Sequence, residues 1–88
     1  MKWTVEYSAD AVEFIDREDL SGQVREQIAL FLKKMRGQAV NLDAKKLKGK
    51  WKGYFRIRKG RLRIIFSVQF DLRVIYIERV DFRGQAYK

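Results

Sequence analysis

The chain has 88 residues, of which 47% are hydrophobic and 35% are charged, which is typical of one globular domain over residues 1–88 and excludes a disordered chain or two independent cores. The formal net charge is +9 and the isoelectric point is about 10.1, so an anionic partner is indicated, with nucleic acid as the first candidate. Cysteine and histidine are absent, which removes disulfides, thiolate metal sites and the usual general base.

The N-terminal part predicts a strand followed by a short helix. Residues 2–7 alternate, with Trp3, Val5 and Tyr7 on one side, as a half-buried strand requires. Ser8 is a predicted N-cap for a helix that ends near Asp16 and turns Val12 and Ile15 inward. This segment has no apolar run of a signal peptide, and no stretch of the chain is apolar enough to span a membrane, so we expect a cytoplasmic protein without a membrane partner.

A second helix is predicted from an N-cap at Ser21 to a stop at Gly37. Its apolar residues recur at helical spacing: Val24, Ile28, Phe31, Leu32 and Met35. The opposite face carries the basic residues Arg25, Lys33, Lys34 and Arg36. A solvated helix face explains these charges better than a binding surface does.

The C-terminal half predicts a basic connection over residues 38–53 and then an antiparallel meander of three strands. Strands are expected over residues 54–58, 61–70 and 72–80, with the third in a central position covered on both sides. In the connection, Leu42, Leu47 and Trp51 are expected to anchor onto the core. The predicted fold class is therefore α+β, with both helices packed on one face of a single, mostly antiparallel sheet.

The hairpin RIRKGRLR (residues 56–63) concentrates like charge. A two-residue turn at Lys59-Gly60 would pair Arg58 with Arg61 and Arg56 with Arg63. All four arginines would then share the sheet face opposite the helices, which destabilises the sheet unless carboxylates, counterions or a polyanion offset the charge. A solvated edge hairpin is one interpretation, and anion binding is favoured over it because arginine binds phosphate bidentately.

The lysines of the preceding connection are a second basic group. They are Lys45, Lys46, Lys48, Lys50 and Lys52. Together with Arg58 and Arg61, they are predicted to bind a polyanion such as RNA by adding electrostatic attraction. Taken alone, these lysines fit a solvated loop equally well.

Three stretches in this order resemble a known family: KLKG at 46–49, YFRIRKGRLRIIF at 54–66 and FRGQAYK at 82–88. They look like the RelE/ParE superfamily of toxins from toxin-antitoxin systems, and more specifically its RelE branch of ribosome-dependent messenger RNA interferases. The resemblance covers nearly the whole chain and implies a RelE-like fold. Phe55 is one extra residue relative to the commonest form of the family's hairpin motif.

The resemblance also implies a reaction and its residues. By matching family positions, Arg56, Arg63, Arg83 and Tyr87 are the expected catalytic residues, with Arg58 as an addition. The family reaction is attack of a ribose 2′-hydroxyl on the adjacent phosphate of messenger RNA in the ribosomal decoding site. No cofactor or metal is implied. Without histidine, proton transfer falls to Tyr87, to a lysine such as Lys52, or to an arginine that acts by orientation.

The expected partners are a ribosome carrying messenger RNA and a cognate antitoxin. An antitoxin is expected because a free translation-blocking enzyme would harm its own cell, and it should be acidic in part. Two alternatives remain open at this stage: a ParE-like toxin that inhibits DNA gyrase, and an RNA-binding module without catalysis. The pair Arg83 and Tyr87 favours the nuclease over the gyrase inhibitor.

Overall fold

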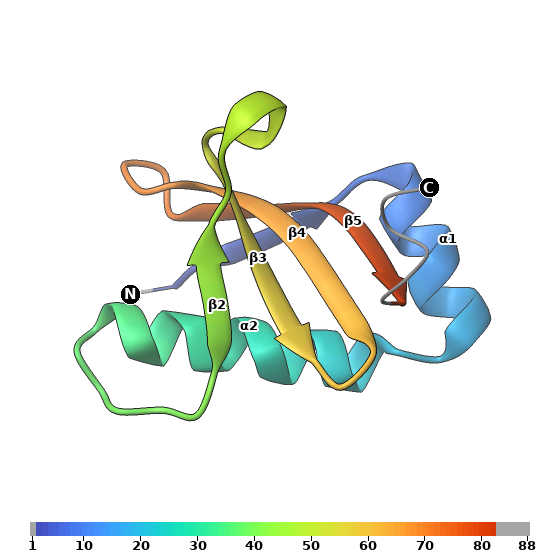
Figure 1. Cartoon of the computed structure of the whole chain (residues 1–88), viewed down its shortest axis with the longest axis horizontal. Coiled ribbons are helices and arrows are strands. Elements are labelled where there is room, and N and C mark those ends of the chain that lie inside the picture. Colours follow the sequence, from blue (N-terminus) through green and yellow to red (C-terminus); the bar gives the residue numbers. More distant parts are fainter. Residues whose placement is uncertain (1, 83–88) are drawn as a thin grey trace.

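The computed structural model describes residues 2–82, in which two helices pack against one five-stranded sheet (Figure 1). The elements in chain order are β1 (Thr4–Tyr7), α1 (Ala9–Glu18), α2 (Ser21–Met35), β2 (Asp43–Lys46), the 3-10 turn η1 (Gly49–Trp51), β3 (Tyr54–Lys59), β4 (Leu62–Gln69) and β5 (Val74–Phe82).

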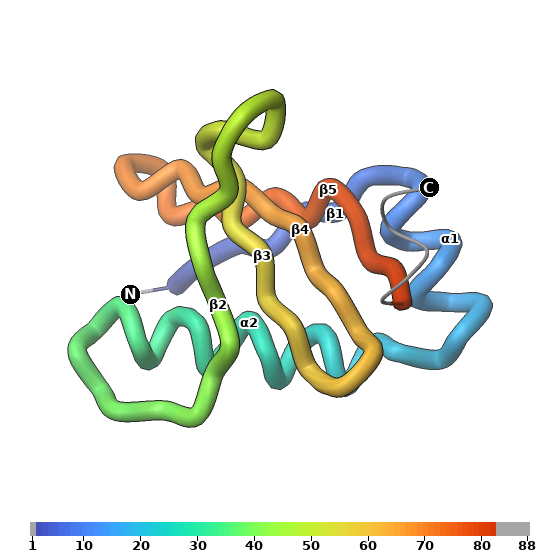
Figure 2. The backbone as a smooth tube through the Cα atoms, viewed as in Figure 1, coloured from blue at the N-terminus to red at the C-terminus, as the bar shows by residue number. Residues whose placement is uncertain are grey.

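The sheet has the strand order β1-β5-β4-β3-β2 (Figure 2). Only β1 and β5 run parallel, and the other three pairs are antiparallel. The α+β prediction, with its meander of β3, β4 and β5, is therefore confirmed. The strand β5 has neighbours along both edges, as its predicted central position requires, and its buried residues Ile75, Ile77 and Val80 belong to the core.

The core lies between α2 and the sheet. The ring centroid of Phe31 is 5.3 Å from that of Phe55 and 4.8 Å from that of Phe66, both in edge-to-face geometry that aromatic pairs prefer. Ile28 and Val24 are buried one and two turns away from Phe31, as their helical spacing predicts. Met35 is 38% exposed, so the predicted apolar stripe ends one turn before the helix does.

The helix α1 begins at the predicted cap and ends later than predicted. The Ser8 hydroxyl accepts a hydrogen bond from the Ala11 amide at 3.1 Å and donates one to the Glu78 carbonyl at 2.7 Å. The helix continues to Glu18 rather than Asp16 and is closed by Asp19 in the left-handed conformation. Val12 is 43% exposed, whereas Ala11, Phe14 and Ile15 are buried, so the predicted inner face was wrong at Val12.

The start of α2 differs by one residue from the prediction. Leu20 occupies the N-cap position and makes no side-chain capping hydrogen bond, while Ser21 is the first helical residue. Leu20 is 5% exposed and belongs to the core. Burial of an apolar side chain, rather than a polar cap, therefore holds the start of α2 in place.

The strand β2 lies inside the stretch predicted as a connection. Its sequence, DAKK, lacks the apolar alternation by which strands are found, and it forms because its backbone pairs with β3 at the edge of the sheet. The anchors Leu42, Leu47 and Trp51 are half-buried, and Leu42 packs against the core.

The register of the β3-β4 hairpin also differs from the prediction. Lys59 pairs with Leu62, so the turn consists of Gly60 and Arg61, and Gly60 has a φ of +60°, which a left-handed turn position needs. Arg58 therefore lies opposite Arg63, and Arg56 lies opposite Ile65. Because the pairing moved by two residues, each side chain of the two strands keeps its predicted face.

The last strand, β5, runs from Val74 to Phe82, so it begins and ends two residues later than predicted. Leu72 lies in the preceding turn and is 66% exposed. Opposite Ile65 and Phe66 the register between β4 and β5 shifts, which inserts Glu78 as an extra residue of β5. This bulge places the Glu78 carbonyl where the Ser8 hydroxyl binds it.

Ser8, which caps α1, and Ser21, which begins α2 without capping it, give a matched test of helix capping. Ser8→Ala should lower the free energy of unfolding by about 1–2 kcal/mol, because it removes the cap hydrogen bond and the bond to β5. Ser21→Ala should change the free energy of unfolding by less than about 0.5 kcal/mol, because Ser21 does not cap its helix. Urea denaturation of both variants measures the difference, and equal losses would contradict this assignment of the caps.

Candidate functional site

The sheet face turned away from the helices carries most of the arginines of the hairpin. We call it the arginine face and define it by Tyr54, Arg56, Arg58, Arg63 and Ile65. These residues alternate along β3 and β4 with core residues such as Ile57 and Ile64. Ile65 is buried but lies outside the core cluster, as its position on this opposite face requires.

One row of residues across this face, which we call the first row, has a carboxylate at each end and two arginines between them. Asp43 of β2 lies opposite Arg58 of β3, Arg58 opposite Arg63 of β4, and Arg63 opposite Asp81 of β5. Two like charges side by side in a sheet are unfavourable, and here a carboxylate stands next to each of them. The sheet register therefore supplies the neighbouring carboxylates that the sequence required but did not locate.

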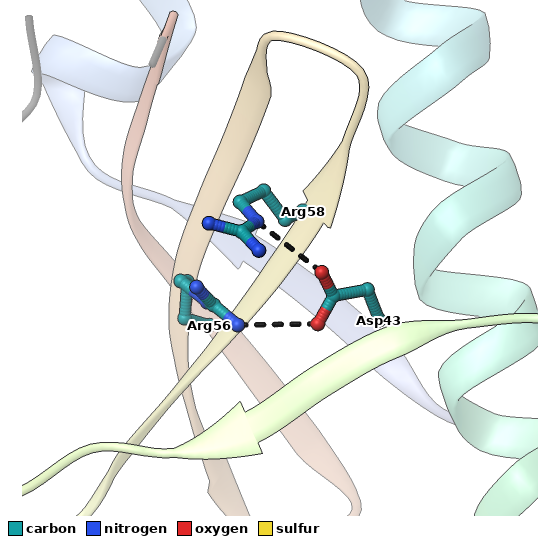
Figure 3. Close-up of polar contacts among 3 residues, drawn as sticks. All are labelled: Asp43, Arg56 and Arg58. Carbon is teal, nitrogen blue, oxygen red and sulfur yellow. Dashed lines mark hydrogen bonds and ion pairs between the residues drawn. The ribbon is translucent and has the colours of Figure 1, made fainter. Parts of the chain in front are cut away.

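Asp43 joins two arginines through one carboxylate (Figure 3). Its Oδ1 lies 3.2 Å from Nη2 of Arg56, and its Oδ2 lies 3.2 Å from Nε of Arg58. Each oxygen accepts one charge-assisted hydrogen bond, so the two guanidinium groups are held in fixed relation to each other.

The second row consists of Lys45, Arg56, Ile65 and Arg79 across the same four strands. Arg56, which the family resemblance implies as catalytic, is 7% exposed and thus lies beneath the surface. Arg79 contacts Asp81, with its Nε 3.6 Å from Oδ2. Of the two hairpin arginines that belong to β3, only Arg58 has substantial exposure, at 36% of its side chain.

Arg61 does not lie on the arginine face as predicted. It belongs to the turn, and its guanidinium carbon lies 5.2 Å from the ring centroid of Phe82, a residue that packs against the core. The register explains this difference, because a turn residue is not bound by the alternation of the strands. Arg61 is exposed, so contact with RNA from this position stays a prediction.

The lysines of the connection divide between the two sides of the sheet. Lys45 pairs with Arg56 and belongs to the arginine face, whereas Lys46 pairs with Phe55 and belongs to the helix side. Lys46, Lys48 and Lys52 line a pocket of about 570 Å³ together with apolar residues that include Val68 and Phe70. Lys50 is exposed in η1. All five lysines are exposed, and three of them line this pocket rather than the arginine face.

The two tail residues of the predicted site, Arg83 and Tyr87, lie outside the described residues. Their predicted roles are therefore retained as proposals. In β5, Asp81 of the first row directly precedes Phe82, the last described residue of the strand.

Two carboxylates beside this face, Asp43 and Glu78, were not anticipated from the sequence. The Tyr54 hydroxyl donates a hydrogen bond to Oε1 of Glu78 at 3.3 Å. The pKa of Tyr54 is raised, mainly by burial and secondly by the negative charge of Glu78. Trp51 lies edge-on to Tyr54, with ring centroids 5.2 Å apart. Asp43 and Glu78 carried no sequence signal, because one lies in an unrecognised strand and the other in a bulge.

An apolar pocket of about 360 Å³ lies on the helix side, between the end of α2 and the sheet. Its lining includes the rings of Phe31, Phe55 and Phe70 together with Met35. Lys34 and Lys46 also line it. Phe70 is 58% exposed and Leu72, in the same turn, is 66% exposed, so apolar surface continues beyond the pocket.

Within residues 2–82, no three carboxylate, cysteine or histidine side chains gather closely enough to hold a metal ion. Over the same residues, no helix has both the length and the apolar character needed to cross a membrane.

Comparison with known proteins identifies structural relatives. No family model and no curated protein matches the sequence. A chain of the RelB-RelE antitoxin-toxin complex from Methanococcus jannaschii is 29% identical, with 93% of this chain and 94% of that chain covered and a TM-score of 0.60. The archaeal RelE-RelB complex from Pyrococcus horikoshii OT3 gives 26% identity, coverage of 98% and 100%, and a TM-score of 0.60.

A chain of the Escherichia coli DinJ-YafQ complex gives a TM-score of 0.70 at 14% identity, with 99% of this chain and 100% of that chain covered. At that identity the likeness concerns the fold alone. These three structures span nearly the full length of this chain, so the two helices and the sheet are shared as a unit.

Asp81 provides a test of the electrostatics of the arginine face. Burial raises the pKa of Asp81, although Arg79 and Arg17 act in the opposite direction. A carboxyl whose pKa is higher in the folded than in the unfolded chain stabilises the fold at low pH, and this contribution is lost as pH rises through the folded-state pKa. Asp81→Asn should therefore be more stable than the parent at about pH 7, with the difference shrinking towards about pH 3.

Thermal unfolding at both pH values measures this difference, with Asp71→Asn, at an exposed turn, as the control. A variant less stable than its parent at neutral pH would show that the ion pairs of Asp81 outweigh its desolvation.

Proposed function

We propose, from the premise that this chain belongs to the RelE-like toxin superfamily, that it is the toxin of a type II toxin-antitoxin system and cleaves messenger RNA on the ribosome. The likeness to RelE chains at 26–29% identity over nearly the full length supports the premise. The opposed pair Arg58 and Arg63 on the arginine face is the observation that carries the catalytic part of the proposal. A ribosomal substrate implies action in the cytoplasm.

The proposed reaction needs charge stabilisation more than it needs many catalytic groups. The ribose 2′ oxygen forms a bond to phosphorus and gives up its proton, while the bond from phosphorus to the 5′ oxygen breaks and that oxygen takes up a proton. The products are a 2′,3′-cyclic phosphate and a 5′-hydroxyl. Negative charge gathers on the phosphate oxygens in the transition state, and guanidinium groups stabilise it without changing protonation state.

We assign the charge-stabilising role to Arg63 and to Arg83 of the tail. Arg63 is half-buried in the middle of the first row, where neighbouring strands restrict its movement. Arg58 is placed beside it to contact phosphate, and buried Arg56 acts from beneath. Tyr87 is the proposed proton-transfer or hydrogen-bonding group. Alignment of substrate by the ribosome accounts for a site with so few acid-base groups.

The remaining basic residues suit long-range attraction rather than catalysis. Lys45, Lys48, Lys50 and Lys52 are exposed. Together with the net charge of +9, they favour encounter with ribosomal RNA, and this attraction weakens as salt rises. The lysines therefore contribute to affinity, and the ordered arginines contribute to the chemical step.

The cleavage rate tests this assignment. Arg63→Ala should slow single-turnover cleavage on programmed ribosomes by about two to three powers of ten, or ~3 kcal/mol in the barrier, because one preorganised donor is lost. Arg63→Lys should recover only part of the rate, since lysine keeps the charge but lacks the bidentate fork. Arg25→Ala, on the exposed side of α2, removes the same charge and should leave the rate unchanged. Arg83→Ala and Tyr87→Phe belong in the same assay.

Ribosome-free controls separate the nuclease from its alternatives. Cleavage only with ribosomes supports the proposal. Gyrase-dependent DNA damage without RNA cleavage would identify a ParE-like inhibitor, and RNA binding without either activity would identify a non-catalytic module. Cleavage at the parental rate by both Arg63→Ala and Arg83→Ala would remove the catalytic assignment.

We also propose a cognate antitoxin as partner, since the matched archaeal RelE chains come from complexes with RelB. An apolar pocket lined by Phe31, Phe55 and Phe70 and bordered by lysines fits an amphipathic, partly acidic segment. Phe70→Ala should weaken binding of the protein encoded beside this gene by about tenfold to a hundredfold. Val12→Ala, which truncates an exposed apolar residue of α1, should not weaken it. Calorimetric titration measures both, and equal affinities would exclude this pocket.

A further inference from the structure

Asp43 stands out because one carboxylate is shared by two arginines of unequal exposure. The side chain of Arg56 is 8% exposed, that of Arg58 is 36% exposed, and that of Asp43 is 50% exposed. Arg56 is therefore covered, whereas Arg58 and Asp43 reach solvent. Figure 3 shows both arginines contacting the one carboxylate of Asp43.

Arg56 depends on this carboxylate for its charge compensation. Among residues 2–82, Asp43 is the carboxylate that forms an ion pair with Arg56, and the Nε of Arg56 is buried without a hydrogen-bond partner. A buried cation that loses its counter-charge must either leave the interior or remain uncompensated. Asp43 therefore keeps Arg56 in place beneath the arginine face.

Arg58 is bound by Asp43 at a single point. Its Nε–H donates a hydrogen bond to Oδ2 of Asp43, and its two terminal nitrogens form no hydrogen bond within the described part of the chain. A guanidinium tied at Nε still has its outer edge available for two parallel bonds to a phosphate. It has also lost rotational freedom before the substrate arrives, which lowers the entropic cost of binding the transition state.

We propose that Asp43 is a positioning residue, whose carboxylate orients the terminal nitrogens of Arg58 towards the RNA phosphate beside Arg63 and holds Arg56 beneath them. This inference rests on the proposed function. Asp43 does not touch the substrate; it acts through Arg58. Its negative charge lowers the positive charge of the face, so it improves the geometry at the expense of electrostatic attraction.

Because Asp43 improves geometry but weakens attraction, its removal should affect two kinetic constants differently: the maximal rate and the ribosome concentration that gives half of it. Asp43→Asn keeps the size of the side chain but loses the charge and one acceptor oxygen, so Arg58 is oriented less well. The single-turnover rate at saturating ribosome concentration should fall about tenfold. The concentration that gives half of the maximal rate should not rise, because the variant gains one unit of net positive charge. Glu26→Gln, an exposed site on α2, makes the same change of charge and should leave the maximal rate unaltered.

A double-mutant cycle tests whether Asp43 acts through Arg58. In an Arg58→Ala background, Asp43→Asn should change the maximal rate by less than about threefold, since the group that it orients is absent. A full tenfold loss in both backgrounds would overturn the proposal. So would a faster rate for Asp43→Asn alone, which would make the carboxylate a competitor of phosphate.

Nuclear magnetic resonance gives a readout that does not require activity. The Nε proton of Arg58 should exchange slowly with water in the parent and rapidly in Asp43→Asn. Asp43→Glu, which restores the charge and both oxygens, should recover part of the protection and part of the rate, and it serves if Asp43→Asn does not fold. Rapid exchange in the parent would overturn the proposal. If the parent cleaves no messenger RNA, the proposed function fails, while slow exchange still supports the role of Asp43 in positioning.

Discussion

The register that places Asp43, Arg58, Arg63 and Asp81 in one row across four strands is the constraint on which the proposed site depends. Two guanidinium groups directly opposite each other in a sheet repel, and the hairpin sequence alone offers nothing to offset that repulsion. Asp43 of the flanking strand β2 forms ion pairs with Arg56 and Arg58, and Asp81 of β5 stands opposite Arg63 in the register. The sheet thus tolerates a concentration of arginine that would be unfavourable in an isolated hairpin.

The arrangement of layers makes this possible. Both helices pack on one face of the sheet, where Phe31, Phe55 and Phe66 form the centre of the core. The opposite face is consequently left for polar groups, and the edge strand β2 brings Asp43 next to β3. A short strand at the sheet edge therefore has a structural consequence, since without its pairing Arg56 would be a buried cation without a counter-charge.

Charge serves two purposes in the proposed function. The exposed lysines and the overall positive charge act over long distances and do not require order. The arginines of the hairpin act at contact distance, where orientation matters, and Asp43 and the neighbouring strands restrict their movement. This division fits the proposed function, in which the ribosome presents the messenger RNA and the protein supplies fixed positive charge.

The sequence determined the order of the main elements, the core face of α2 and the face of each hairpin residue except Arg61, because these follow from local periodicity. It pointed to Arg58 and Arg63 through their position on the non-core face, whereas Arg83 and Tyr87 rest on family resemblance alone. Only the tertiary structure decided the turn at Gly60, the strand β2 and the partners of the arginines. Strand pairing is a contact between distant segments, so neither DAKK nor Asp43 carries a local signal of it. Register depends on the sum of those contacts, and the position of a charge relative to its counter-charge depends on register.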